Sequence, residues 1–338
     1  MMLSWLSKIY GYFTDRRNRA FDSGERPSVS FDRPIISIGN LNTGGTGKTP
    51  HVEYLVRLLQ DQYKLGILSR GYGRKTKGYR LAGPNDSAET LGDEPYQYRR
   101  KFDNQVQVAV SEKRVLGASE LIADTDPDVI VLDDAFQHRQ IKPGLQLLLT
   151  THQEPYSRDQ LLPKGRLRER ADGAHRADAI ILTKCPHSLS EEDRQSWKKE
   201  LAPMPHQPLF FSTFTYGDIE AQSPVEIANP MQVIALAGIA KPEPFLDELK
   251  NRYNVVSEHV FRDHYRFSKK DLLRLRRDVE QHGKETTAIV TTEKDFTRLL
   301  PFRDIWKEWA LYVLPIEARI EPKAKFDQMI FDYVGKSK

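Results

Sequence analysis

The segment at residues 34–50, PIISIGNLNTGGTGKTP, constrains the fold of this chain more than any other. Its isoleucine-rich start, residues 35–38, has the β-branched composition of a buried parallel strand. A glycine-rich turn follows at 43–49, and apolar residues then recur at helical spacing from 52 to 59. A strand, a glycine-rich turn and a helix in this order are the context in which a phosphate-binding loop is expected.

Glycines allow successive backbone N–H groups to curl around phosphate oxygens, and the helix N-terminus adds partial positive charge. We expect Lys48 to reach the β- and γ-phosphates of a nucleotide and the Thr49 hydroxyl to contact Mg²⁺. The usual pattern has glycine at the position of Asn42, so the loop looks like the GG-x-GK-T variant. The alternative is a glycine-rich turn that binds nothing. The expected nucleotide-binding residues are Asn42, Thr43, Gly44, Gly45, Thr46, Gly47, Lys48 and Thr49.

Composition narrows the class of protein. The 338 residues suffice for about two domains. The net charge of +4 is mild, so a nucleic-acid partner is not required. The single cysteine, Cys185, excludes an internal disulfide and fits a reducing compartment. No apolar run reaches the roughly 18 residues of a membrane-spanning helix.

The N-terminal segment combines apolar periodicity with a basic end. Apolar residues recur at helical spacing from Leu3 to Phe13, and Arg16, Arg17 and Arg19 follow. This pattern predicts an amphipathic helix that could lie in a membrane interface, with its arginines near anionic headgroups. A helix docked on the body of the protein is an equally compatible alternative.

Two basic segments are candidates for anion binding. Residues 70–80 hold five positive residues and no acid, and they follow a predicted strand at 64–69. Loops at that edge of an α/β sheet bind ligands, and arginine forks onto phosphate, so we favour phosphate binding over a merely solvated loop. The second basic segment, residues 161–170, is long, and long loops are often functional.

Acidic residues follow a buried strand. The apolar run at 129–132 leads directly into Asp133 and Asp134, as in a Walker B element, whose carboxylate holds Mg²⁺. A strand ended by a turn-forming Asp pair is the alternative. Asp93 and Glu94 begin a predicted helix, where two acids usually interact only with the helix dipole.

The alternation of strands and helices breaks in the proline-rich stretch 203–230 and restarts at 233–237. The predicted fold class is therefore α/β, with a P-loop NTPase-like parallel-sheet domain and a second, smaller α/β domain. A strand at 311–314 is expected to be the last one. The expected parts are residues 1–30 as the amphipathic membrane-interface helix, 31–215 as the P-loop domain and 216–338 as the smaller domain.

Taken together, these segments resemble the tetraacyldisaccharide 4′-kinase family, the lipid A kinases of Gram-negative bacteria. The matching motifs are IGN…GGTGKTP at 38–50, LSRGYGR at 68–74, GDEP at 92–95, LDDAFQHR at 132–139, LLPKGRLRE at 161–169, DHY at 263–265 and TTEKD at 291–295. The resemblance implies two α/β lobes and transfer of phosphate from ATP, with Mg²⁺, to the 4′-hydroxyl of tetraacyldisaccharide 1-phosphate. It also implies peripheral membrane contact through the N-terminal helix, at the cytoplasmic face of the inner membrane, and no nucleic-acid partner.

The resemblance assigns roles to single residues as well. It implies a catalytic dyad of Asp93 and His264 beside Lys48, in which an acid or an imidazole takes the proton of the sugar hydroxyl. Which dyad member touches the hydroxyl stays open, and without the resemblance His264 would be a core or capping histidine. The implied Mg²⁺ residues are Thr49, Glu94, Asp133, Asp134 and Glu169, with Asp134 favoured over Asp133. The implied phosphate or substrate residues are Arg70, Arg74 and Arg168.

The chain departs from the family at two positions. Ala135 stands where glycine is more frequent, and Arg170 stands where proline is more frequent. Arg170 removes a rigid turn residue next to Glu169 and adds a positive charge.

Two other functions are compatible with the residues. A P-loop ATPase or GTPase, such as a metallochaperone or a partitioning ATPase, would switch on hydrolysis and would need no surface for acyl chains. A non-catalytic basic protein that binds membranes or nucleic acid would tolerate the substitution Lys48→Ala. Nucleic acid is the weakest of these partners, because no base-stacking aromatic residues accompany a basic stripe.

Overall fold

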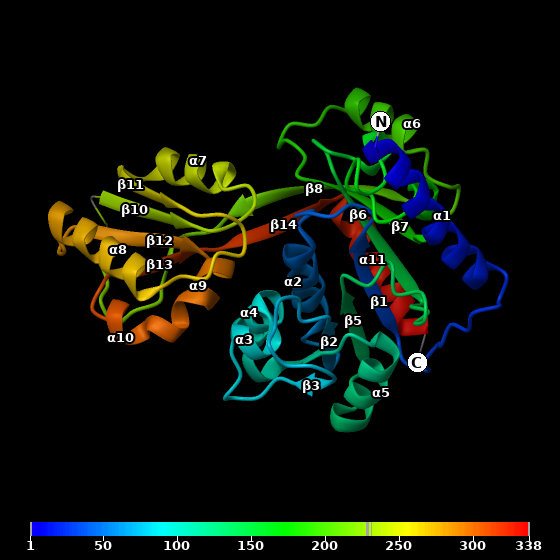
Figure 1. The fold of residues 1–338 in the computed structure, drawn as a ribbon, viewed down its shortest axis with the longest axis horizontal. Coiled ribbons are helices and arrows are strands. Elements are labelled where there is room, and N and C mark those ends of the chain that lie inside the picture. The colour runs from blue at the N-terminus through cyan, green and yellow to red at the C-terminus, as the bar shows by residue number, and fades with distance from the viewer. Residues whose placement is uncertain (1, 228–229, 231, 337–338) are drawn as a thin grey trace. The chain divides into compact units, whose positions relative to one another are not determined.

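The computed structural model describes residues 2–227, 230 and 232–336 (Figure 1). Two compact units are present: Met1–Phe214 with Ala318–Lys338, and Thr215–Glu317. The chain leaves the first unit within strand β8 (Leu209–Tyr216) and returns to it within strand β14 (Ile316–Glu321).

The C-terminal residues belong to the first unit, whereas the sequence analysis assigned all of 216–338 to the second domain. Phe326, Ile330 and Val334, on helix α11 (Lys323–Lys336), are buried in the apolar core of the first unit. Burial of this apolar stripe explains why α11 belongs to the first unit, because the helix is stabilised where its apolar side chains are removed from water.

The first unit is built on a nine-stranded sheet with the order β14-β8-β7-β6-β1-β5-β2-β4-β3. The pairs from β8 across to β4 are parallel, and the edge strand β3 is antiparallel to β4. The strands not yet bounded are β1 (Ile35–Asn40), β2 (Leu65–Ser69), β3 (Arg80–Leu81), β4 (Val106–Val110), β5 (Val129–Asp133), β6 (Leu145–Thr151) and β7 (Ala179–Thr183).

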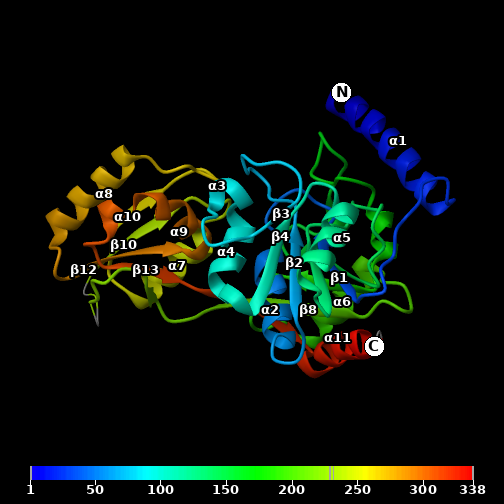
Figure 2. The same ribbon diagram turned by 90° about the horizontal axis from the view of Figure 1, so that it is seen from below.

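Helices cover both faces of this sheet. Neighbouring residues of β1 point to opposite faces and therefore enter different cores. Helices α2 (Lys48–Leu59) and α11 lie on one face (Figure 2), where Ile36 and Ile38 pack against them, whereas Ile35 packs with α5 (Arg114–Thr125) on the other. The helices of the first unit are α1 (Met2–Asp22), α2 (Lys48–Leu59), α3 (Ala88–Leu91), α4 (Asp93–Phe102), α5 (Arg114–Thr125) and α6 (Glu191–Leu201), with short 3₁₀ turns η1 (Asp103–Gln105), η2 (Tyr156–Arg158) and η3 (Ala171–Arg176).

The second unit has its own sheet, with the order β11-β10-β12-β13-β9, in which only β9 is antiparallel to its neighbour among the described pairs. Its elements are β9 (Glu220–Ala221), β10 (Gln232–Ala237), α7 (Glu243–Arg252), β11 (Val255–Val260), α8 (Lys269–His282), β12 (Thr287–Thr292), α9 (Glu293–Leu299), η4 (Leu300–Phe302), α10 (Arg303–Trp306) and β13 (Leu311–Leu314). The α/β fold class is confirmed. The expectation that 311–314 is the last strand is wrong, because β14 and α11 follow it.

Helix α1 combines features of both interpretations of the N-terminal segment. Its small and polar residues Ser7, Gly11 and Thr14 are buried against the first unit. Its large apolar residues face outward, and Trp5 and Phe13 are each 62% exposed. Within the described part of the chain, no helix has the length and apolar character needed to cross a bilayer.

Candidate functional site

The parallel strands of the first unit bring four loops to one edge of the sheet. These loops follow β1, β2, β5 and β6, which are paired with one another in parallel. Ligands of open α/β sheets bind outside the carboxyl ends of the strands, so this edge is the expected site. The loops contain residues 41–47, 70–79, 134–144 and 152–178.

The glycine-rich loop after β1 has the geometry of a phosphate loop. Gly44 has φ of 124° and Gly47 has φ of 85°, and helix α2 begins directly after Gly47. The Thr183 hydroxyl at the end of β7 donates a hydrogen bond to the Thr46 carbonyl at 2.9 Å. A hydrogen bond from β7, which is separated from β1 by β6, thus fixes the loop just before α2 begins.

The side chains of His51 and Asn42 hold the phosphate loop in place through hydrogen bonds. The buried His51 ring places Nδ1 2.8 Å from the Gly47 carbonyl and Nε2 3.0 Å from the Ser212 hydroxyl. Burial lowers the pKa of His51 to about 4, so this ring is neutral at physiological pH. Asn42, the departure from the usual pattern, is buried and donates from Nδ2 to Asp159 at 2.7 Å. The Asn42 side chain therefore anchors the loop to Asp159, a hydrogen bond that glycine at this position could not make.

The substitution Gly47→Ala is expected to destabilise the protein by about 1–2 kcal/mol, because an L-residue is strained in the left-handed region. A Cβ atom at this position would also overlap the ring of Phe214. The matched control is Gly45→Ala, since Gly45 has no positive φ and a Cβ atom there would meet no other atom within 4 Å. Urea unfolding measures both variants; equal destabilisation by the two would contradict the described loop geometry.

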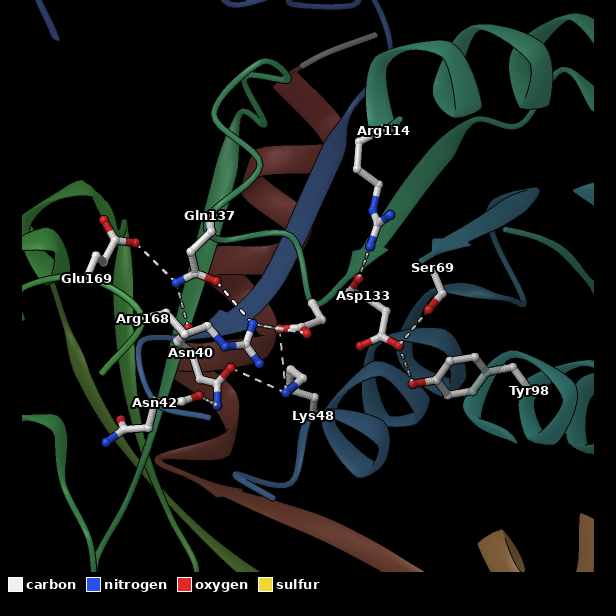
Figure 3. A network of polar contacts seen from close by, with 11 residues as sticks. Asn40, Asn42, Lys48, Ser69, Tyr98, Arg114, Asp133, Gln137, Arg168 and Glu169 are labelled. Carbon is white, nitrogen blue, oxygen red and sulfur yellow. Dashed lines mark hydrogen bonds and ion pairs between the residues drawn. The ribbon is translucent and has the colours of Figure 1, made fainter. Parts of the chain in front are cut away.

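Two cations converge on one carboxylate beside the loop (Figure 3). The Lys48 ammonium lies 3.6 Å from Asp134 Oδ1 and donates to Asn40 Oδ1 at 3.3 Å. Arg168 Nη1 donates to both carboxylate oxygens of Asp134, at 3.0 and 3.1 Å. Burial works to raise the pKa of Asp134, but Lys48 and Arg168 outweigh it and hold the pKa at about 2.

Asp133, at the end of β5, is buried in a different environment. Ser69 and Tyr98 direct their hydroxyls at Oδ2 from 3.3 and 3.4 Å, and Arg114 donates to the Asp133 carbonyl at 3.2 Å (Figure 3). The other carboxylate oxygen, Oδ1, is buried without a hydrogen-bond partner. Burial raises the pKa of Asp133 to about 6, against the opposing effect of Lys48.

This orphaned oxygen suits a metal ion that prefers oxygen ligands. Among the described residues, no three His, Cys, Asp or Glu side chains are grouped closely enough to hold a metal by themselves. Mg²⁺ commonly takes only one or two protein carboxylates and completes its shell with water and phosphate oxygens. Glu94 is near enough to raise the pKa of Asp133 further, and Thr49 is the second residue of α2. The donor set therefore fits Mg²⁺ in the presence of a nucleotide.

Glu169 has a different environment from the other acids predicted to hold Mg²⁺. Its side chain is 0% exposed and accepts from Asn18 at 2.6 Å, from Gln137 at 3.1 Å and from Arg176 at 2.8 Å. These donors occupy both carboxylate oxygens, so the contacts give Glu169 a structural role in tying loops together. We therefore remove Glu169 from the proposed metal residues.

The three arginines predicted to bind phosphate lie in three environments. Arg70 is exposed at the end of β2. The side chain of Arg74 is only 2% exposed and pairs with Glu112 at 2.6 Å, so it holds its own loop. Arg168 is the one that reaches the phosphate loop region, through Asp134. Sequence reasoning missed Arg114, which carries no motif and is recognisable only from its contact with the Asp133 backbone.

His264, in the second unit, has a left-handed backbone conformation, with φ of 55°. Lys294 lies 3.3 Å from its Nε2, and Arg298 lies 3.4 Å from its Nδ1. Arg298 is itself held by the buried Asp295 at 2.9 Å, which explains part of the TTEKD motif. Asp93 is the first residue of α4 in the first unit, so the predicted dyad draws one member from each unit.

Comparison with known proteins gives consistent matches. Residues 1–334 match the family model described as tetraacyldisaccharide-1-P 4′-kinase. A tetraacyldisaccharide 4′-kinase of Bacteroides thetaiotaomicron is 42% identical over 358 residues, covering 99% of this chain and 92% of that protein. The corresponding protein of Flavobacterium johnsoniae is 43% identical, covering 97% of this chain and 95% of its own length.

A solved structure agrees with these matches. The crystal structure of LpxK from Aquifex aeolicus in complex with ATP superposes with a TM-score of 0.77 at 28% identity. The superposition covers 99% of this chain and all of that one, 100%.

Proposed function

Because the chain belongs to the tetraacyldisaccharide 4′-kinase family, we infer that it transfers phosphate from ATP to the 4′-hydroxyl of tetraacyldisaccharide 1-phosphate in lipid A biosynthesis. The observation that carries this function in the structure is the pair of cations, Lys48 and Arg168, gathered on Asp134 beside the phosphate loop. A triphosphate carries more negative charge than one carboxylate. Both cations would therefore be drawn to its phosphates, where they stabilise the charge of the transferred group.

We propose that Mg²⁺ would be held by Asp133, whose Oδ1 has no partner, with Glu94 close by and Thr49 close to Tyr98, whose hydroxyl contacts Asp133. When bound, the metal ion supplies charge neutralisation at the phosphates. Asp133 and Glu94 would hold this ion, while Asp134 keeps the two cations in place.

The substitution Asp133→Asn is expected to weaken the Mg²⁺-dependent gain in thermal stability with ATP. An unchanged Mg²⁺ titration of that gain would remove Asp133 from the site.

We propose further that Asp93 and His264 act together on the 4′-hydroxyl. A sugar hydroxyl loses its proton as the phosphoryl group arrives, and a carboxylate–imidazole pair can accept it. Lys294 and Arg298 flank the imidazole in the second unit, and they would favour the approach of an anionic substrate to that ring.

The outward apolar face of α1 supports peripheral contact with a membrane, and we propose that this membrane surface is the cytoplasmic face of the inner membrane. The double variant Trp5→Ser/Phe13→Ser is expected to weaken cosedimentation with anionic liposomes severalfold, because both side chains are exposed and bury apolar surface on binding. Leu116→Ser, an exposed leucine on α5, is the matched control. Equal binding by the double variant and the wild type would refute the interfacial helix.

The function itself is tested by incubating the protein with labelled ATP and tetraacyldisaccharide 1-phosphate and separating the lipids. A bis-phosphorylated lipid is expected. Loss of ATP without a labelled lipid would favour the alternative of a P-loop ATPase, and no loss of ATP would favour a non-catalytic binding protein.

A further inference from the structure

Helix α1 is docked on the first unit through a face that makes specific polar contacts. Ser7 Oγ donates to the Leu161 carbonyl at 3.0 Å and accepts from the Lys164 amide at 3.1 Å. Gly11 lies so close that a Cβ atom there would be 2.8 Å from a methyl group of Leu161. A general amphipathic helix needs neither feature, because apolar contact alone would hold it. The docking face of α1 is therefore complementary in shape and in hydrogen bonding to the basic loop, residues 161–170.

The same face holds the part of the basic loop that reaches the nucleotide site. The Tyr10 hydroxyl donates to the Arg168 carbonyl at 2.8 Å. Asp15 pairs with Arg170 at 2.7 Å. An exposed ion pair of this kind contributes little by itself. Its position next to Arg168 nevertheless shows that α1 contacts the loop on both sides of that arginine.

The C-terminal end of α1 is joined to the loop that follows β5. Arg139 donates to the Asn18 carbonyl at 2.8 Å and to Asp22 at 2.6 Å, and its guanidinium lies 5.2 Å from the centre of the Phe21 ring. The Asn18 amide also donates to Glu169 of the basic loop at 2.6 Å. One helix thus connects the two loops that supply Arg168 and Asp134.

We propose that α1 is a positioning element for the nucleotide site, in addition to any role at a membrane. Its docking face fixes the backbone of Arg168, so that the guanidinium stays at Asp134 and ready for a phosphate. Tyr10 and Gly11 are positioning residues in this scheme. The inference rests on the proposed function for the identity of the nucleotide, but it is measured without any lipid.

The test is the affinity for a fluorescent ATP analogue with Mg²⁺, measured in buffer free of lipid and detergent. Gly11→Leu should weaken the affinity about five- to tenfold, the size of one or two lost hydrogen bonds. Tyr10→Phe, which keeps the ring and removes one donor, should weaken it about threefold. Tyr12→Ala on the exposed face is the control, and it should leave the affinity for the analogue unchanged while weakening binding to liposomes.

A rescue separates positioning from a general loss of structure. Adding Leu161→Ala to Gly11→Leu makes room for the new side chain and should restore most of the affinity. If Gly11→Leu lowers the melting temperature strongly, Tyr10→Phe decides the question. Wild-type affinity in Tyr10→Phe, or in a stably folded Gly11→Leu, would overturn the proposal. Weakened affinity in a protein that phosphorylates no lipid would instead keep the positioning role of α1 and reject the proposed function.

Discussion

Replacing Lys48 with alanine is expected to lower kcat for phosphate transfer by about 10²–10³-fold or more, the size typical of losing one preorganised charge at a transition state. The ammonium group stands at the start of α2, 3.6 Å from Asp134. It is the group best placed to follow the charge that develops on the transferred phosphoryl group. The measurement is the initial rate of formation of the bis-phosphorylated lipid at saturating ATP.

The fold should survive this change. Asp134 keeps its two hydrogen bonds from Arg168, so the variant leaves no isolated buried carboxylate. Lys64→Ala is a suitable control, because Lys64 is exposed and precedes β2 at the opposite edge of the sheet. A Lys48→Ala protein with the melting temperature and the turnover of the control would exclude the phosphate loop from catalysis.

The local sequence was sufficient for much of the fold because the central strands carry an unmistakable pattern. Runs such as 35–38 and 129–132 are apolar on both faces, as strands covered by helices must be. Strand β8 was missed because prolines before and after it suggested a linker, although LFFSTFTY has a strong β composition. Helix α11 has a local apolar period at 326, 330 and 334, but its place in the first unit depends on a core some 300 positions earlier in the chain, which no local window contains.

Local sequence patterns have the same limit at the candidate site. Lys48, Asp133 and Asp134 could be found from spacing, because a strand, a loop and a helix fix their positions locally. Glu169 was placed at the metal by analogy, but its carboxylate direction depends on Asn18, which is 151 positions away. Arg114 carries no motif at all. Contacts of this kind follow from tertiary packing, so only a structure reveals them.

Replacing Asp93 with asparagine is expected to lower kcat by about 10²–10⁴-fold, the range for loss of a general acid–base group. Asparagine keeps the shape of the side chain at the start of α4 and removes its capacity to take a proton. The neighbouring variant Glu94→Gln is the comparison: it should raise the Mg²⁺ concentration needed for activity, whereas Asp93→Asn should stay slow at saturating Mg²⁺.

Coupling between Asp93 and His264 can be measured although they belong to different units. If the two form one proton-accepting unit, the double variant Asp93→Asn/His264→Ala should be about as slow as the slower single variant, since removing either already disables the pair. Independent residues would instead multiply their effects. The contradicting outcome is a multiplicative loss of kcat in the double variant, with both single variants folded and able to bind ATP. That result would show that Asp93 and His264 act independently and that a single base deprotonates the 4′-hydroxyl.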